Sequence, residues 1–298
     1  MNRYIRFILT VGVSLVAGSA QAQLFDPFRP APGSFRGAPT IFDWSGPAGE
    51  PGGPPGFDEP LASDRPDFTE SSTTVGRGVV QIEMGYTFIR DNDGGTYYNT
   101  HSFPESLFRV GMFADWFEFR FAYNHGIQLV APPAISANTV AGGEDLYTGV
   151  KLALTSQRRW LPEMAIVPQF TIPSGDTDFS AHDVLPGVNW LYGWDITERL
   201  STGGSTQVNK SVDDDGTNYY EFAQSWTVGF GWTNRLGSYI ELFSHHPSGA
   251  SSAKPEYYLD GGLTFRVTNN LQLDARAGTG INGAAADYFL GSGAVVRF

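Results

Sequence analysis

The chain has 298 residues, a formal net charge of -12 at pH 7 and no cysteine. Without cysteine there can be no disulfide scaffold, thiolate metal site or cysteine nucleophile, and the acidic balance argues against a nucleic-acid partner. Charged residues make up only 17% of the chain, against roughly 25% in soluble domains, while aromatic residues reach 14%. With 36 glycines as well, the composition is typical of a β-rich protein with a large apolar surface.

Residues 1–22 have the pattern of a secretory signal peptide. Two arginines precede an apolar stretch over residues 7–17, and small residues follow up to Ala22. The apolar stretch is shorter than the roughly 20 residues that a membrane-spanning helix needs. We therefore expect Sec-dependent export and cleavage after Ala22.

Residues 23–62 are rich in proline and glycine and include nine of the 19 prolines in the chain. Proline lacks the backbone donor that a sheet requires, so this segment is expected to form no strand. We expect a disordered, extended linker on the periplasmic side of a membrane.

From residue 79 onward, apolar and polar residues alternate with the period of a β-strand. One such run places Phe117, Phe119 and Phe121 on one face and Glu118 and Arg120 on the other. The pattern predicts twelve strands, over residues 79–89, 105–114, 117–128, 145–155, 163–173, 183–195, 199–209, 219–232, 237–246, 256–267, 271–281 and 286–298.

In every predicted strand one face can be chosen that carries no charge, while the opposite faces hold seven acids and six bases. A soluble β-sandwich is the alternative arrangement of such strands. In a membrane barrel the charged faces point inward, and we expect these residues to line a pore: Glu83, Arg109, Glu118, Arg120, Lys151, Glu221, Glu241, Asp260, Arg266, Asp274, Arg276, Asp287 and Arg297. Their nearly balanced signs predict weak ion selectivity.

Three features favour an all-β, twelve-stranded antiparallel transmembrane barrel of the outer-membrane type over 79–298. Short turns alternate with longer polar loops, near 90–104, 129–144, 174–182, 210–218 and 247–255. Tryptophans beside the short turns predict an aromatic girdle at the membrane interface: Trp116, Trp160, Trp194 and Trp232. The terminal Phe298 resembles the C-terminal signal read by the barrel-assembly machinery. Expected partners are therefore that machinery, outer-membrane lipids and lipopolysaccharide.

A specific motif opens the region after the linker. It reads Ser63-Asp64-Arg65-Pro66-Asp67-Phe68-Thr69-Glu70-Ser71, then Thr74-Val75, Gly78, Gln81-Ile82-Glu83 and Gly85-Tyr86. This motif resembles the family of outer-membrane transporters labelled "MetA-pathway of phenol degradation". The resemblance implies an outer-membrane barrel with a transport role, related in idea to channels that take up hydrophobic compounds.

The lead-in segment, residues 63–78, is too polar for a lipid-facing strand. We expect Asp64, Arg65, Asp67 and Glu70 to enter the periplasmic mouth as a plug and to pair with lumen charges such as Arg109, Arg120 or Arg297. A solvated lead-in to the first strand is the equally weighted alternative.

We assign no catalytic residue, metal site or cofactor. Ser244 and His246 share one strand face and are the only candidates for a barrel-embedded lipid hydrolase, because His245 points the opposite way. The favoured function is a passive channel or transporter for small molecules, hydrophobic or aromatic compounds included. A lipid hydrolase and a purely structural barrel are the two alternatives.

Overall fold

The computed structural model describes residues 20–21, 54–133, 135–213 and 215–298. The predicted signal peptide, except Ala20 and Gln21, and residues 23–53 of the predicted linker lie outside this part. Every regular element in the described ranges is a strand: β1 Ala20–Gln21, β2 Pro66–Asp67, β3 Val80–Asp93, β4 Thr96–Gly111, β5 Phe117–Ala131, β6 Asn138–Gly143, β7 Leu146–Thr155, β8 Glu163–Ile172, β9 Leu185–Asp195, β10 Leu200–Val212, β11 Asn218–Gly231, β12 Leu236–Ser248, β13 Glu256–Thr268, β14 Leu271–Gly280 and β15 Tyr288–Arg297.

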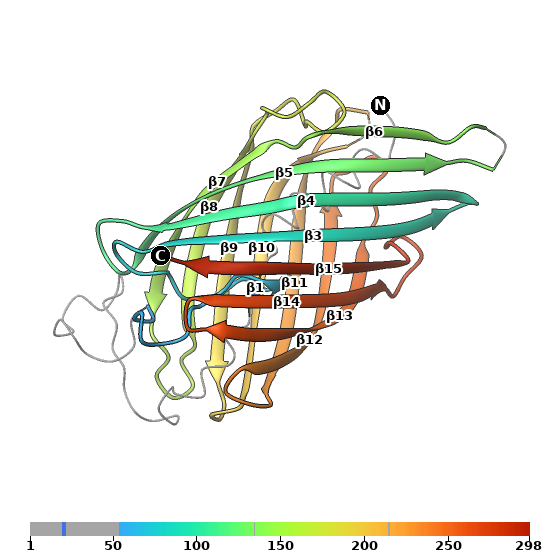
Figure 1. Ribbon diagram of the computed structural model, residues 1–298. Coiled ribbons are helices and arrows are strands. Elements are labelled where there is room, and N and C mark those ends of the chain that lie inside the picture. The colour runs from blue at the N-terminus through green and yellow to red at the C-terminus, as the bar shows by residue number, and fades with distance from the viewer. Residues whose placement is uncertain (1–19, 22–53, 134, 214) are drawn as a thin grey trace.

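Strands β3 to β15 form one closed antiparallel barrel (Figure 1). β15 pairs with β3, and β4 pairs with both β3 and β5, so the ring has no open end. β6 and β7 both pair with β5, at different heights, and together fill one strand position. The barrel therefore has twelve strand positions, which confirms the predicted fold class.

In the described residues, no helix has the length and apolar character needed to cross a membrane.

Side chains alternate between the two faces of the barrel wall. On β11, Glu221, Ala223 and Ser225 are buried inside, while Phe222 and Trp226 are exposed outside. Large apolar side chains populate the outer face of the other strands as well, among them Met84, Phe170, Trp190, Ile240, Leu242, Leu263, Leu273 and Leu290. An apolar outer wall around a polar interior is the pattern of a transmembrane barrel.

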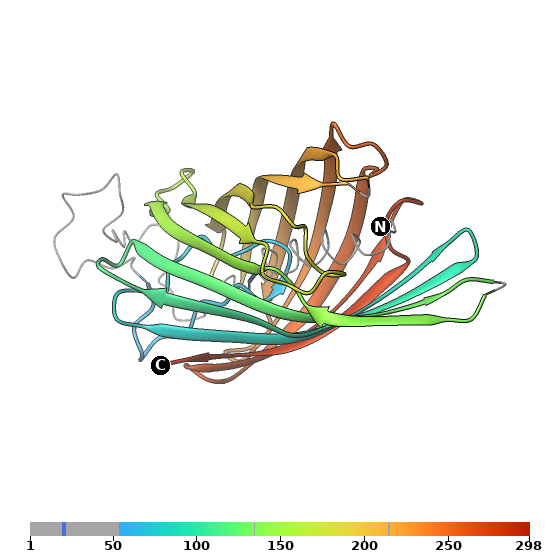
Figure 2. The same cartoon turned by 90° about the horizontal axis from the view of Figure 1, so that it is seen from above.

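Two of the loops facing away from the short turns are much shorter than predicted. β3 and β4 continue to Gly94 and Gly95, which alone connect them, so the predicted loop 90–104 is the end of a long hairpin. Both glycines have positive φ, 58° and 89°, and two such residues fit the tight turn that a twisted hairpin requires. β6 likewise lies within the predicted loop 129–144. These strands make one side of the barrel extend beyond the rest (Figures 1 and 2).

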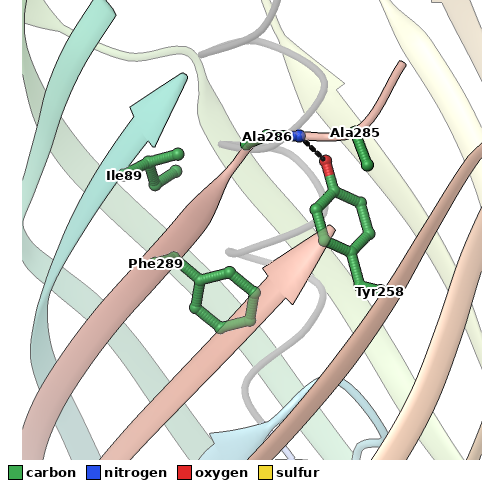
Figure 3. Close-up of a cluster of buried hydrophobic side chains, with 5 residues drawn as sticks. All are labelled: Ile89, Tyr258, Ala285, Ala286 and Phe289. Carbon is green, nitrogen blue, oxygen red and sulfur yellow. Dashed lines mark hydrogen bonds between the residues drawn. The ribbon is translucent and has the colours of Figure 1, made fainter. Parts of the chain in front are cut away.

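A small apolar cluster lies inside the barrel near the long-loop end. Ile89, Tyr258, Phe289, Ala285 and Ala286 pack together, and the backbone N–H of Ala286 donates to the Tyr258 hydroxyl at 3.2 Å (Figure 3). Ala285 and Ala286 belong to the β14–β15 loop, so the cluster ties that loop to the inner wall.

The position of Leu242 on the lipid-facing side of β12 can be tested by introducing one charge there. Leu242 lies in the middle of β12 and is 54% exposed. Because arginine at this depth would enter hydrocarbon, Leu242→Arg should lower the free energy of unfolding by about 2–4 kcal/mol. The control is Ile196→Arg in the β9–β10 connection, where the expected cost is about 0–1 kcal/mol. Guanidinium chloride unfolding in phospholipid vesicles measures both, and equal losses would contradict the assignment.

Candidate functional site

The chain enters the barrel at the end formed by the short turns. The guanidinium of Arg297 on β15 donates to the carbonyl oxygens of Pro55, Gly56 and Glu59, at 2.9, 2.9 and 2.7 Å. The N–H of Leu61 donates to the carbonyl oxygen of Asn269 in the β13–β14 turn, at 2.8 Å. The last residues of the predicted linker thus dock on the rim, and the boundary between linker and packed chain lies before residue 62.

Residues 61–76, here called the lumen loop, are buried throughout. The loop rises from the rim to Phe68 and Thr69, which meet the middle of β11 and β12, and returns to the rim at Thr74. Its side chains and backbone bind inward-facing groups of β3, β4, β5, β7, β8, β11, β12 and β14. The lumen loop therefore crosses the inside of the barrel.

The carboxylate of Asp64 is the charged centre of the lumen loop. Its oxygens lie 2.9 Å from Lys151 Nζ, 3.2 Å from Arg109 Nη1 and 2.9 Å from Arg120 Nη2. Burial alone would raise the pKa of Asp64, but the three cations outweigh it and lower the pKa to about 2. Asp64 is therefore ionised at any physiological pH.

Asp64 also joins the two limbs of the lumen loop. Its carboxylate accepts the N–H of Ser71 at 3.0 Å, and Lys151 donates to the carbonyl oxygen of the same residue at 2.7 Å. The backbone N–H of Asp64 donates to Glu83 at 3.0 Å. One residue thus fixes the rising limb, the returning limb and the wall to one another.

Arg65 occupies a niche in the wall made by two glycines. Gly85 on β3 and Gly293 on β15 are register partners, and an added Cβ would lie 2.2 Å and 2.3 Å from the Arg65 guanidinium. The guanidinium pairs with Asp274 at 3.1 Å and Glu105 at 3.3 Å. Because only glycine leaves this space, the wall is shaped to receive Arg65.

The returning limb binds mostly through its backbone. The carbonyl oxygen of Thr73 accepts from Arg109 at 2.9 Å, and the N–H of Val75 donates to Glu118 at 2.9 Å. Glu70 pairs with Arg120 at 2.5 Å. Backbone contacts of this kind hold the path of the chain whatever side chains it carries.

The structure places most of the thirteen predicted lining charges against the N-terminal chain. Nine bind residues 55–76: Glu83, Arg109, Glu118, Arg120, Lys151, Glu241, Asp274, Arg276 and Arg297. Two bind other wall groups, since Glu221 pairs with His245 at 3.2 Å and Asp260 accepts from Tyr239 at 2.8 Å.

Arg266 and Asp287 are not deep in the lumen. Arg266 is half-buried at the short-turn rim and donates to the carbonyl oxygen of Asn234 at 3.1 Å. Asp287 is exposed and precedes β15, so its predicted inward position is corrected. The strand begins later than predicted because residues 281–287 form the loop that ends in the apolar cluster.

The two halves of the sequence motif meet in space. Gln81 donates to the carbonyl oxygen of Ala62 at 2.7 Å, Glu83 accepts from Asp64, and Gly85 forms the niche for Arg65. Further wall groups that were not predicted also contact the lumen loop, among them Glu105, Glu163, Ser225 and Gly293. For Glu105 and Glu163, the charge was the only feature of the sequence that indicated an interior position.

The four predicted girdle tryptophans all lie at the short-turn end. Trp160 is 91% and Trp232 61% exposed, while Trp116 and Trp194 are half-buried. Phe298 follows β15 and exchanges backbone hydrogen bonds with Val80, at 2.8 and 3.1 Å, beside the β15–β3 seam. Their roles at a membrane interface and in barrel assembly stay predictions.

Ser244 and His246 lie together on the outer face of β12. His246 Nε2 is 3.0 Å from Ser244 Oγ, and the His246 ring packs edge-on against Tyr257. Within the described residues, no carboxylate or amide is hydrogen-bonded to the other ring nitrogen of His246. The described residues also include no group of three side chains arranged to hold a metal ion.

Removing the charge of Asp64 should release the lumen loop. Asp64→Asn leaves three buried cations with one fewer counter-charge, and breaking such a buried pair costs about 3–5 kcal/mol. We expect faster amide hydrogen exchange across 61–76. Asp67→Asn is the matched control, because neither carboxylate oxygen of Asp67 has a hydrogen-bond partner. Equal exchange in both variants would show that Asp64 does not hold the loop.

The niche can be tested without changing any charge. Gly85→Ala places a methyl group 2.2 Å from Arg65 Nη1, so Arg65 must move and the exchange of amides 63–67 should accelerate. Gly283→Ala, in the β14–β15 loop, is the control because its added Cβ meets no atom within 4 Å. Unchanged exchange in the Gly85 variant would exclude a fitted niche.

Solved structures with the same architecture include the COG4313 outer membrane channel from Pseudomonas putida F1. It matches at a TM-score of 0.58 with 12% identity, over 74% of this chain and 96% of that one. The NanC porin (TM-score 0.45, 11% identity, 74% and 100% covered) and the transport unit of the autotransporter AIDA-I from Escherichia coli (0.47, 12%, 74% and 89%) are more distant. At these identities the likeness shows the fold alone.

No curated protein sequence matches the chain. A family sequence pattern does match it, over residues 63–298, and thus covers the lumen loop and the whole barrel. The chain therefore belongs to the family described as "Putative MetA-pathway of phenol degradation".

Proposed function

We propose that this protein is an outer-membrane channel for passive movement of small solutes, and that the lumen loop closes it. The observation that carries the proposal is the position of the loop inside a twelve-stranded barrel, held by Asp64 on Arg109, Arg120 and Lys151. A barrel of this size lies between eight-stranded barrels, which side chains fill, and 16–18-stranded barrels, which leave an open channel.

The fold supports transport more directly than catalysis. The structure with TM-score 0.58 is named an outer membrane channel, and most of the predicted lining charges lie inside, where a solute would pass. A structural barrel would have no need of a receptor built into its wall for its own N-terminal chain, with paired glycines that fit Arg65.

Closure by a segment that enters and leaves at the same rim needs no rearrangement of the barrel. Both ends of the lumen loop are fixed at the short-turn rim, through Leu61 on Asn269 and Thr74 on Asp115. Between these rim contacts the loop is held by Asp64 and Arg65, and its tip at Phe68 and Thr69 meets the middle of the wall. We infer that opening consists of withdrawing this tip while the rim contacts stay in place.

A reversible crosslink tests the proposal. Thr69 Oγ1 and Ser225 Oγ are 2.6 Å apart, so Thr69→Cys with Ser225→Cys should form a disulfide between the loop tip and β11. No native cysteine competes. In planar bilayers the oxidised variant should show no conductance steps, and reduction should restore the intermittent openings expected of the unmodified protein. Asp64→Asn should open more often.

The single variant Thr69→Cys, oxidised under the same conditions, controls for effects of the substitution. Equal conductance of the oxidised and reduced double variant would exclude the loop as the closing element. Folded protein that conducts neither as wild type nor as Asp64→Asn would exclude the channel itself.

A further inference from the structure

Two carboxylates face each other on the inner wall beside the loop tip. Glu241 on β12 and Asp260 on β13 are register partners, and both are buried. Glu241 accepts the N–H groups of Phe68 and Thr69, at 2.5 and 2.8 Å. Asp260 accepts from Tyr239 with one oxygen, while its other oxygen has no hydrogen-bond partner.

A third carboxylate, that of Asp67 in the lumen loop, lies near this pair. Asp67, on β2, is fully buried and experiences the charges of both Glu241 and Asp260. Neither of its oxygens has a hydrogen-bond partner. The Thr227 hydroxyl lies beside it and interacts with its carboxylate. A buried carboxylate left in this state is costly unless a proton or a cation joins it.

Among the described wall residues, Arg276 is the one cation at this place. The guanidinium of Arg276 interacts with Asp260 and donates to the carbonyl oxygen of Pro66 at 2.9 Å. Three carboxylates thus share one positive charge. Around Asp64, by contrast, three cations meet four carboxylates, those of Asp64, Glu70, Glu83 and Glu118. The negative excess is therefore larger on the strip of wall from β12 to β14.

Aromatic rings border the three carboxylates. Phe68 stacks on Phe243 with centroids 4.7 Å apart, and Phe243 shares the inward face of β12 with Glu241. Phe289 reaches over Gly278, where an added Cβ would lie 2.2 Å from the ring and 2.6 Å from Asp260 Cβ. The Arg276 guanidinium already lies over the Phe289 ring, 5.4 Å from its centroid, so a cation is accepted against this surface.

Cleavage of the signal peptide would change the surroundings of Asp67. β2 pairs with β1, Gln21 opposite Pro66 and Ala20 opposite Asp67. In a chain cleaved after Ala22, as the sequence predicts, β1 is absent and this edge of β2 loses its partner.

We propose that Asp67, Glu241 and Asp260, with the rings of Phe68, Phe243 and Phe289, form a binding site for a small organic cation, an ammonium group that carries an apolar or aromatic substituent. The carboxylates take the charge and the rings take the substituent. An organic ammonium suits the site better than a metal, since the described carboxylates are not arranged as a metal-ligand group. The inference rests on the proposed channel function and names its solute class.

The test is isothermal titration calorimetry on the processed protein purified in detergent, with benzylammonium as the probe and benzyl alcohol as its neutral counterpart. We expect benzylammonium to bind, and benzyl alcohol to bind at least tenfold more weakly. Asp67→Asn should weaken benzylammonium binding tenfold or more without disturbing the fold, since its oxygens hold no hydrogen bond. Asp260→Asn is a second variant with the same expected direction.

Asp183→Asn, which removes a carboxylate from the partly exposed pair with Lys210, is the matched control and should bind like the unmodified protein. The inference is overturned if benzylammonium does not bind, if benzyl alcohol binds equally well, or if Asp67→Asn and Asp260→Asn leave the affinity unchanged. Binding in detergent requires no conductance, so a failure here is distinguishable from a failure of the channel proposal.

Discussion

Charges inside a narrow barrel must be neutralised by the chain itself, and the carboxylate of Asp64 does this for three cations at once. Arg109, Arg120 and Lys151 come from three neighbouring positions of the wall, are buried, and would repel one another without a counter-charge. The lumen loop brings the counter-charge to them. Loop and wall therefore form one network of ion pairs.

The barrel could be predicted from the sequence because alternation reports directly which face meets hydrocarbon. Phe119 and Arg120 fall on opposite faces, as their chemistry requires. The exception is β4, where the pairing with β5 shifts between Phe103 and Ser106. Ser102 and Glu105 both face inward across this irregularity, and no period-2 pattern anticipates a change of phase. β6 was not predicted as a separate strand, because only Glu144 and Asp145 separate it from β7.

For the lumen loop, the sequence indicated which residues need partners but not which partners they have. The polarity of Asp64 and Arg65 predicted an interior position, and Arg109 and Arg120 do lie on Asp64, whereas Arg297 binds the chain before residue 60. Gly293 could not be singled out, because its role arises only from its register with Gly85. Contacts between distant strands depend on register, which a single sequence leaves open.

The glycine niche lies across the seam at which the first and last strands of the barrel pair. Gly85 belongs to β3 and Gly293 to β15, so the receptor for Arg65 does not exist until these two strands have joined. Asp274, on β14, completes it from the same side of the seam as Gly293. An open sheet therefore cannot hold the lumen loop in place. The loop can therefore dock only after β3 and β15 have paired. An Arg65 side chain bound in the niche indicates that the barrel has closed.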